Sequence, residues 1–318
     1  MIRETTRGFT TTVLALMCLL YAGCERRTAP PENDDSSARP AILRIGYTPT
    51  EETTVDREGA TRLLGGYLSR VLGIKVELVR TESYGPAIEA LASGKIDLIG
   101  LGPFAYVLAE KRGAAEAIVV PGQEAKGPRM YQSAFISGKH TGFLNLKDVP
   151  AQAARIQFNY TDPASNSGHL VPRAKLATLG LRPERDFKST DYTLSHTVAV
   201  LNVALGKADL AGVSNTTLQS LLRKGKIAPD AINVLWISEP LPNGPLAIRA
   251  ALPEALKQEV KTALLNLNKQ EPELSRKIMA QYRDENLVYV KCAKGLYDEI
   301  RALSDQNKVR ISAESEAD

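Results

Sequence analysis

The stretch Asp162-Pro163-Ala164-Ser165-Asn166-Ser167-Gly168-His169-Leu170-Val171-Pro172-Arg173 decides how the chain is interpreted. It follows a strand-like run at 155–160 and leads into apolar residues at helical spacing between 170 and 179. This pattern predicts a helix whose N-terminal N–H groups and positive dipole end face out of the turn, beside hydroxyl and amide side chains. Such an arrangement can bind a small oxyanion. An ordinary Ser/Asn helix cap is the alternative that this stretch alone leaves open.

The composition indicates a globular protein with two medium domains. The chain has 318 residues, of which 43% are hydrophobic and 24% charged, with 40 basic and 36 acidic residues. A net charge of +4 without a dense Lys/Arg block, and only 6% aromatic residues, argue against a nucleic-acid-binding surface. No Cys or His pair has metal-ligand spacing, so neither a metal site nor a cofactor is expected.

The first 24 residues predict a signal peptide. Two arginines precede an apolar run at 12–20, which is too short to span a bilayer and ends in small residues. The end of this segment, Tyr21-Ala22-Gly23-Cys24, resembles a bacterial lipobox, although that motif usually has Leu in place of Tyr21. We therefore expect lipidation at Cys24 and a protein anchored to a membrane of the cell envelope, facing the periplasm. Plain cleavage of the signal peptide is the alternative.

After a polar, Pro-rich segment at 25–41, expected to be a disordered tether, strands and helices alternate. Strands are expected at 42–47, 75–79, 96–100, 117–120, 155–158, 187–190, 208–213, 232–238 and 246–249. Helices are expected at 58–72, 84–93, 103–111, 168–179, 195–205, 216–224, 253–267, 272–283 and 294–304. The alternation implies parallel, doubly wound sheets.

Two extended segments look like crossings between two lobes. The first, at 130–136, follows a Gly/Pro-rich stretch, and the second is the Pro-rich run at 239–245. The predicted fold is therefore α/β, with two doubly wound lobes joined by two crossing segments. Lobe 1 comprises 42–132 and 240–318, and lobe 2 comprises 133–239. Such a hinged clamshell binds its ligand between the lobes, at the carboxyl ends of strands.

Several further side chains could line that cleft. Tyr84 and His196 each lie at the start of a predicted helix, and Tyr131 lies in the first crossing segment. Each could donate a hydrogen bond to an oxyanion beside the turn of Ser165 to Gly168. The alternatives are a packed tyrosine and a structural histidine. Asp209 ends the turn between a predicted helix and a predicted strand, and it either accepts a hydrogen bond from a ligand hydroxyl or caps this turn.

Catalysis is not expected. Ser165, His196 and Asp209 could form a nucleophilic triad, but the serine lacks the Gly-x-Ser-x-Gly surroundings of a nucleophile elbow. The sequence also lacks a phosphate-binding Walker loop, a His-Glu-x-x-His motif and a dinucleotide glycine fingerprint. Adjacent donor side chains suit the holding of an anion better than the activation of a nucleophile.

Together these segments resemble the phosphonate-binding (PhnD-like) substrate-binding proteins of ABC transporters, from Ile42 to about Leu267. The resemblance rests on 162–173, Ser195-His196, 209–215 with Leu218-Gln219, 45–51 and 235–243. It implies a periplasmic-binding-protein fold of the two-crossing, type II-like kind. It also implies the capture of a phosphorus oxyanion and its delivery to an ABC permease in the inner membrane.

The resemblance assigns the ligand contacts by position. A Ser-Thr-Ser turn, two tyrosines and a histidine hold the phosphonate in the family, and here these places are Ser165, Asn166, Ser167, Tyr84, Tyr131 and His196. Relatives that take aminoalkylphosphonates have carboxylates near the ligand ammonium, whereas 215–217 and 242–245 contain none. An unpaired ammonium would be costly to bury. Phosphate, phosphite or a small alkylphosphonate is therefore the expected ligand.

One alternative function belongs to another class of protein. The same two-lobe fold can serve as a ligand-sensing input module that docks on a membrane receptor kinase, and the sequence does not distinguish the two.

Overall fold

A computed structural model describes residues 39–48, 57–282, 284 and 286–315, all of which belong to one unit, Ser37–Asp318. The predicted signal peptide, Cys24 and most of the predicted tether lie outside the described residues.

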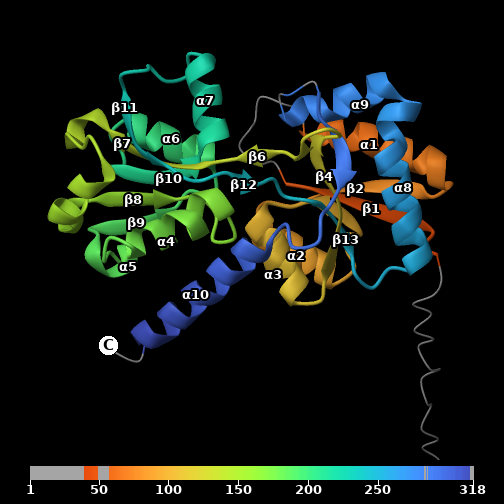
Figure 1. Cartoon of the computed structure of the whole chain (residues 1–318), viewed down its shortest axis with the longest axis horizontal. Coiled ribbons are helices and arrows are strands. Elements are labelled where there is room, and N and C mark those ends of the chain that lie inside the picture. Colours follow the sequence, from red (N-terminus) through yellow and green to blue (C-terminus); the bar gives the residue numbers. More distant parts are fainter. Residues whose placement is uncertain (1–38, 49–56, 283, 285, 316–318) are drawn as a thin grey trace, which may run out of the picture. The chain divides into compact units, whose positions relative to one another are not determined.

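The first sheet has seven strands in the described part of the chain, and it takes them from both ends of the sequence (Figure 1). They are β1 (Ile42–Tyr47), β2 (Lys75–Arg80), β3 (Leu98–Gly100), β4 (Ala115–Gln123), β5 (Gly127–Pro128), β13 (Leu246–Arg249) and β14 (Val288–Lys291). The order is β14-β4-β13-β3-β1-β2, with β5 paired to β4. The accompanying helices are α1 (Arg57–Leu72), α2 (Tyr84–Ala92), α3 (Pro103–Lys111), α8 (Glu254–Gln270), α9 (Pro272–Met279) and α10 (Asp298–Ser315).

The second sheet is formed by the continuous middle of the chain. Its strands are β7 (Ser133–Gly138), β8 (Gln157–Tyr160), β9 (Ser189–Tyr192), β10 (Leu210–Ser214) and β11 (Ile232–Ile237), in the order β11-β7-β10-β8-β9. Its helices are α4 (Val171–Ala177), α5 (Pro183–Asp186), α6 (His196–Ala204) and α7 (Asn215–Arg223), and a π-helical turn, η4 (Asn166–Leu170), precedes α4.

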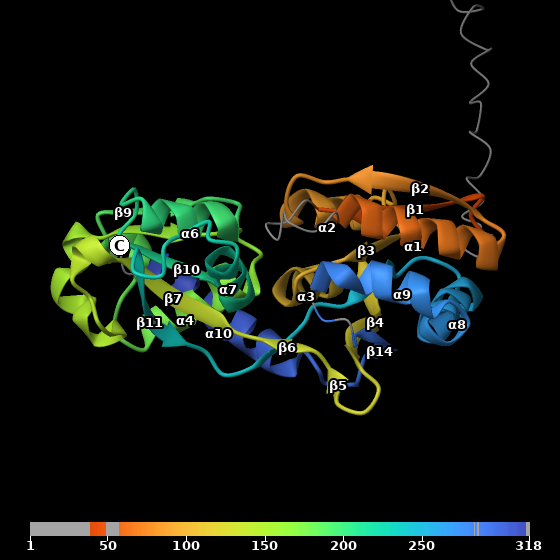
Figure 2. The same cartoon turned by 90° about the horizontal axis from the view of Figure 1, so that it is seen from above.

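Two short strands connect the sheets, β6 (Met130–Tyr131) and β12 (Leu241–Pro242). They pair antiparallel, with Leu241 opposite Tyr131 and Pro242 opposite Met130. Figure 1 labels both strands between the two sheets, and Figure 2 shows β6 from above. The two crossing segments expected from the sequence are therefore hydrogen-bonded to each other.

The prediction that the sheets are parallel is wrong for β5, β13 and β14 in the first sheet and for β7 in the second. β1 pairs in parallel with β2 and β3, but β13 runs antiparallel to β3 and β4. Likewise β8 is parallel to β9 and β10, but β7 is antiparallel to β10 and β11. The chain enters β7 and β13 directly from a crossing, without the helix that a parallel connection requires. Strand and helix alternation says nothing about strand direction at such a point.

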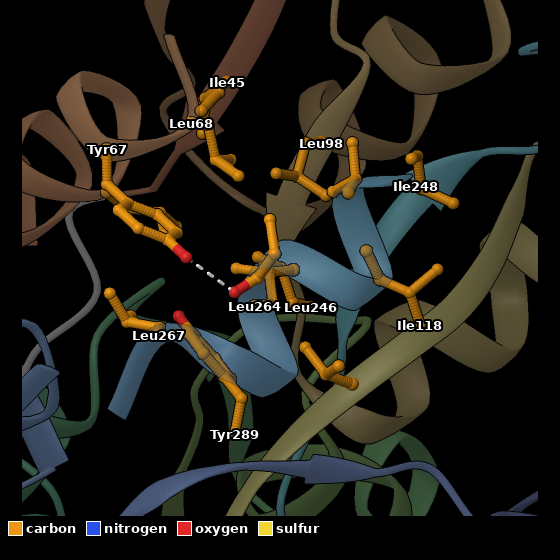
Figure 3. Packing of buried hydrophobic residues seen from close by; sticks show 14 of the residues in the cluster. Ile45, Tyr67, Leu68, Leu98, Ile118, Leu246, Ile248, Leu264, Leu267 and Tyr289 are labelled. Carbon is orange, nitrogen blue, oxygen red and sulfur yellow. Dashed lines mark hydrogen bonds between the residues drawn. The ribbon is translucent and has the colours of Figure 1, made fainter. Parts of the chain in front are cut away.

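A large apolar cluster holds the first lobe together (Figure 3). Tyr67 of α1 and Leu264 of α8 are buried against residues of the sheet, including Ile45, Leu98 and Tyr289. The Tyr67 hydroxyl donates to the backbone oxygen of Ala263 at 2.8 Å, so the one polar atom of this buried ring is satisfied. Each such side chain contributes about 1.5–3 kcal/mol on burial. The cluster thereby joins β1 and α1 to α8 and β14.

In the residues that the structure describes, no helix is both long and apolar enough to cross a membrane. Within the same ranges, no group of three or more His, Cys, Asp or Glu side chains could hold a metal ion. Cys292 is a free, partly buried thiol, and this burial raises its pKa.

Candidate functional site

A cavity of about 110 Å³ lies where the loops of the two lobes meet. It is lined by Thr48, Arg57, Tyr84, Gly100, Leu101, Gly102, Pro103, Arg129, Tyr131, Ser165, Asn166, Ser167, His196, Ser214, Thr216, Thr217, Asn243, Gly244 and Tyr282. Gly100 and Ser214 end strands β3 and β10, so the cavity lies at the carboxyl ends of strands, where open α/β sheets bind ligands. Its volume is enough for several water molecules or one small anion with a short substituent.

The turn that follows β8 is held by its own side chains. The carboxylate of Asp162 accepts from the N–H of Ala164 at 2.7 Å, and the hydroxyl of Ser165 accepts from the N–H of Gly168 at 3.0 Å. Ser165 therefore caps the π-helical turn, which is the role of an ordinary helix cap. It also lines the cavity. The side chains of Ser165, Asn166 and Ser167 are all buried. The turn is thus fixed in place before any ligand arrives.

Contacts to the neighbouring strands fix the same turn from outside. Ser133 of β7 donates its hydroxyl hydrogen to the backbone oxygen of Ser167 at 2.7 Å. The N–H of Thr161 donates to the backbone oxygen of Gly168 at 3.1 Å. The chain approaches itself so closely here that a Cβ added to Gly168 would lie 1.8 Å from Oγ1 of Thr161. Glycine is therefore required at 168 by the lack of space rather than by its φ angle.

Both predicted tyrosines line the cavity. The amide Nδ2 of Asn166 donates to the hydroxyl oxygen of Tyr131 at 3.3 Å, which joins the first crossing segment to the turn. Oδ1 of Asn166 is buried, and no described atom donates a hydrogen bond to it. Tyr84 begins α2, and its N–H donates to the carboxylate of Asp162 at 3.2 Å, so the two lobes are in direct contact beside the cavity.

His196 is a neutral hydrogen-bond donor in this site. It is the first residue of α6, and its Nδ1 accepts from the N–H of Ser214 at 2.9 Å. Burial lowers the pKa of His196 to about 3, so the imidazole is uncharged near neutral pH. Since Nδ1 accepts, the ring proton resides on Nε2. His196 can therefore donate to an oxyanion without bringing a charge into the cavity.

The depressed pKa of His196 predicts a loss of stability in mild acid. The unfolded chain gains a proton near the ordinary pKa of about 6.5, whereas the folded chain does not. Below that pH the free energy of unfolding should therefore fall by up to about 1.4 kcal/mol per pH unit from this group alone. Urea unfolding of wild type and His196→Asn between pH 7 and pH 4 measures it, because the other groups titrate alike in both proteins. Equal pH slopes would show that His196 is not responsible.

The structure also brings together residues that were not predicted as ligand contacts. Arg57 lies in the first turn of α1, and Arg129 lies two residues before Tyr131 and donates from Nη1 to Oδ1 of Asn243 at 3.0 Å. Thr217 lines the cavity, and its buried hydroxyl has no hydrogen-bond partner in the described ranges. In the sequence, the segments 215–217 and 242–245, which contain Thr217 and Asn243, are notable only because they lack carboxylates. Arg129 lies between β5 and β6 rather than in a strand, so strand alternation could not have pointed to it.

Asp209 is not part of this cavity, contrary to its inclusion among the candidate site residues. One carboxylate oxygen lies 2.8 Å from Nε2 of His140, and the other accepts from the N–H of Gln157 at 2.7 Å. Asp209 precedes β10, whereas the cavity lies at the other end of that strand, beside Ser214. The structure therefore supports the alternative in which Asp209 fixes its turn.

Comparison with known proteins identifies the family. Residues 45–292 match the family described as ABC transporter, phosphonate, periplasmic substrate-binding protein. The chain is 27% identical over 263 residues to the Phosphate-import protein PhnD of Mycolicibacterium smegmatis (strain ATCC 700084 / mc(2)155), which covers 79% of each chain. It is 26% identical over 262 residues to the Phosphonates-binding periplasmic protein of Escherichia coli (strain K12), which covers 79% of this chain and 77% of that protein.

The structural comparison agrees. The structure of PhnD1 from Prochlorococcus marinus (MIT 9301) in complex with methylphosphonate aligns with a TM-score of 0.72 at 18% identity, over 85% of this chain and 99% of that one. This similarity confirms the predicted two-lobe periplasmic-binding-protein fold. The relatives are binding components of transporters rather than enzymes, in agreement with the sequence. Because the family match spans most of its length, the chain belongs to the periplasmic substrate-binding proteins of phosphonate ABC transporters.

Proposed function

We propose that this protein captures a phosphorus oxyanion (a phosphonate, phosphite or phosphate) in the cavity between its lobes and delivers it to an ABC permease in the inner membrane. The observation that carries the proposal is the convergence of the turn Ser165–Ser167 with Tyr84, Tyr131 and His196 on one small cavity. These groups belong to both lobes and to the crossing segment. A ligand held by all of them stabilises the arrangement in which the lobes meet, and that differential affinity supplies the signal to the permease.

The chemistry of the donors fits such a ligand. His196 offers an uncharged N–H, and Thr217 and the tyrosines offer hydroxyl hydrogens. Asn166 donates in place of Tyr131 if its amide group turns over on binding. Its Oδ1 then accepts from the Tyr131 hydroxyl, and its Nδ2 faces the ligand. Hydrogen bonds to a charged oxyanion are stronger than those between neutral groups. The names of the relatives, a phosphate importer and a phosphonate-binding protein, support this ligand class.

We also propose that residues 1–24 are removed and that Cys24 carries a lipid, which holds the binding unit at the cell envelope through the tether 25–41. An acyl mass on an N-terminal Cys24 in the mature protein is the result that this proposal requires.

Thermal unfolding of the mature protein in phosphate-free buffer tests the ligand class. A ligand at a hundred times its Kd adds about 2.7 kcal/mol, which raises Tm by about 5–10 °C at this size. We expect this shift with phosphate, phosphite or methylphosphonate, and none with sulfate. A folded, ligand-free protein that responds to no phosphorus oxyanion would contradict the proposal.

In the same experiment, Thr217→Val separates binding from folding. Its buried hydroxyl has no described partner, so removing it should leave the unliganded protein as stable as wild type or more stable. The ligand, however, loses one hydrogen bond, and Kd should rise about tenfold. Ser137→Ala is the matched control, because Oγ of Ser137 is also buried without a described partner but lies outside the cavity. An unchanged Kd in Thr217→Val would remove Thr217 from the site.

A further inference from the structure

Arg129 is held firmly at the wall of the cavity. It lies between β5 and β6, opposite Asn243 on the second crossing segment, whose N–H donates to the backbone oxygen of Arg129 at 2.9 Å. The N–H of Arg129 in turn donates to Pro121 at 2.8 Å, and Nη1 donates to Oδ1 of Asn243 at 3.0 Å. The backbone of Arg129 is therefore held by β4 and by the second crossing segment, and its guanidinium is held by the second crossing segment.

The charge of Arg129 is not neutralised by the described part of the chain. Asn243, its side-chain partner, is a neutral amide, and no described carboxylate forms an ion pair with Arg129. The described residues that line the cavity include no Asp or Glu. A guanidinium has five N–H donors in a planar fork, so most of its donors stay available after the bond to Asn243. A half-buried cation of this kind favours a ligand that brings negative charge to it.

Arg129 lies away from the turn that would hold the phosphoryl group. Tyr131, which contacts Asn166 of that turn at 3.3 Å, lies in β6, two residues further along the chain than Arg129. In an extended chain, residues i and i+2 lie about 6.6 Å apart. Because the chain enters the second lobe after Tyr131, Arg129 is on the side of the first lobe. When the phosphoryl group of the ligand lies beside Ser165–Ser167, the opposite end of the ligand therefore lies next to Arg129.

We propose that Arg129, positioned by Asn243, forms a second anion subsite, and that the preferred ligand is a phosphonate that carries a carboxylate two or three bonds from phosphorus. This inference rests on the proposed function, since it assumes the phosphoryl group at the turn. The planar guanidinium matches a carboxylate in geometry as well as in charge. Arg57 lines the same cavity and adds positive charge, although the inference does not depend on it.

Calorimetric titration with matched pairs of ligands tests this subsite. Phosphonoacetate is compared with ethylphosphonate, and 3-phosphonopropionate with propylphosphonate. In each pair, the carboxylate of the first ligand occupies the position of the terminal methyl group of the second. Wild type should bind the carboxylate member of at least one pair about tenfold more tightly or better. Arg129→Gln should abolish that preference, so that the two members of each pair bind with Kd values within about threefold of each other. Arg223→Gln, which removes the same charge from an exposed position at the end of α7, should change neither value.

The outcomes separate the two proposals. If wild type binds methylphosphonate but shows no preference for a carboxylate, the second subsite is wrong and the proposed function stands. If Arg129→Gln weakens every phosphonate equally, Arg129 holds the phosphoryl group or the crossing itself, and the subsite is again wrong. If folded wild type binds no phosphorus compound at all, the proposed function fails and the subsite fails with it.

Discussion

Gly168→Ala is expected to weaken ligand binding by about a hundredfold and to destabilise the protein by about 1–3 kcal/mol. The new Cβ would meet Oγ1 of Thr161 at 1.8 Å and Cβ and Cγ2 of the same residue at 2.8 Å. Thr161 is fully buried and bonded through its backbone to residue 168, so it has little room to retreat. The turn must move instead, and its hydrogen-bond donors no longer point toward the same place in the cavity. Calorimetric titration with methylphosphonate and urea unfolding measure the two effects.

Two further variants serve as a control and as a test of the steric cause. Gly66→Ala is the control, because Gly66 lies inside α1 and its added Cβ would meet only Nη1 of Arg70, at 3.9 Å. That change should stabilise the protein by about 0.5–1 kcal/mol and leave Kd unchanged. Adding Thr161→Ala to Gly168→Ala removes two of the three close atoms and should restore part of the affinity. Wild-type affinity in Gly168→Ala alone would show that the turn does not hold the ligand.

Arg249→Met is expected to lower the free energy of unfolding by about 3–5 kcal/mol without changing the affinity for ligand. Asp97, whose side chain is 1% exposed, accepts from Nε of Arg249 at 2.9 Å and from the N–H of Arg44 at 2.8 Å, and Nη2 of Arg249 lies 2.9 Å from the same carboxylate. Methionine preserves the apolar stem of Arg249 but leaves a buried carboxylate without its cation. Because Asp97 precedes β3 and the cavity lies beyond the other end of that strand, Kd should stay within about twofold of wild type.

The measurements are urea unfolding and calorimetric titration, with two matched variants. Adding Asp97→Asn to Arg249→Met removes the buried charge and should recover part of the lost stability. Arg62→Met breaks an exposed pair with Glu58 and should cost less than about 1 kcal/mol. If Arg249→Met costs no more than Arg62→Met, the ion pair of Asp97 is not a source of stability.

Much of the fold could be predicted from local patterns. The helix at 103–111 and the strand at 246–249 have the bounds that the sequence predicts, the former because a proline marks its first turn. The helix predicted at 168–179 instead begins as the π-helical turn Asn166–Leu170 and ends at Ala177. β14 was not predicted, since Val288–Lys291 is too short for a clear alternation. The directions of β7 and β13 depend on how the lobes are joined, which no local pattern records.

The site was predictable where a motif and an element end coincide. Ser165, Asn166, Ser167, Tyr84, Tyr131 and His196 line one cavity, although their role as ligand contacts stays a prediction. Asp209 was a poor candidate, because open α/β sheets bind ligands at the carboxyl ends of strands and Asp209 lies at the amino end of β10. Arg129 and Thr217 could not be selected from the sequence with the same force. Their importance comes from polar and charged groups that the fold leaves facing a common cavity.

The division of the first sheet between the two ends of the chain sets the order in which the molecule can be made. β13 lies between β3 and β4, so a nascent chain that has emerged only as far as residue 245 leaves both of those strands with an open edge. Tyr67 and Leu68 likewise stay uncovered until α8 has emerged and packs against them. The second sheet, by contrast, is complete once β11 has emerged. The second lobe can therefore fold while the rest of the chain is still emerging, whereas closure of the first lobe depends on its last long-range pairings.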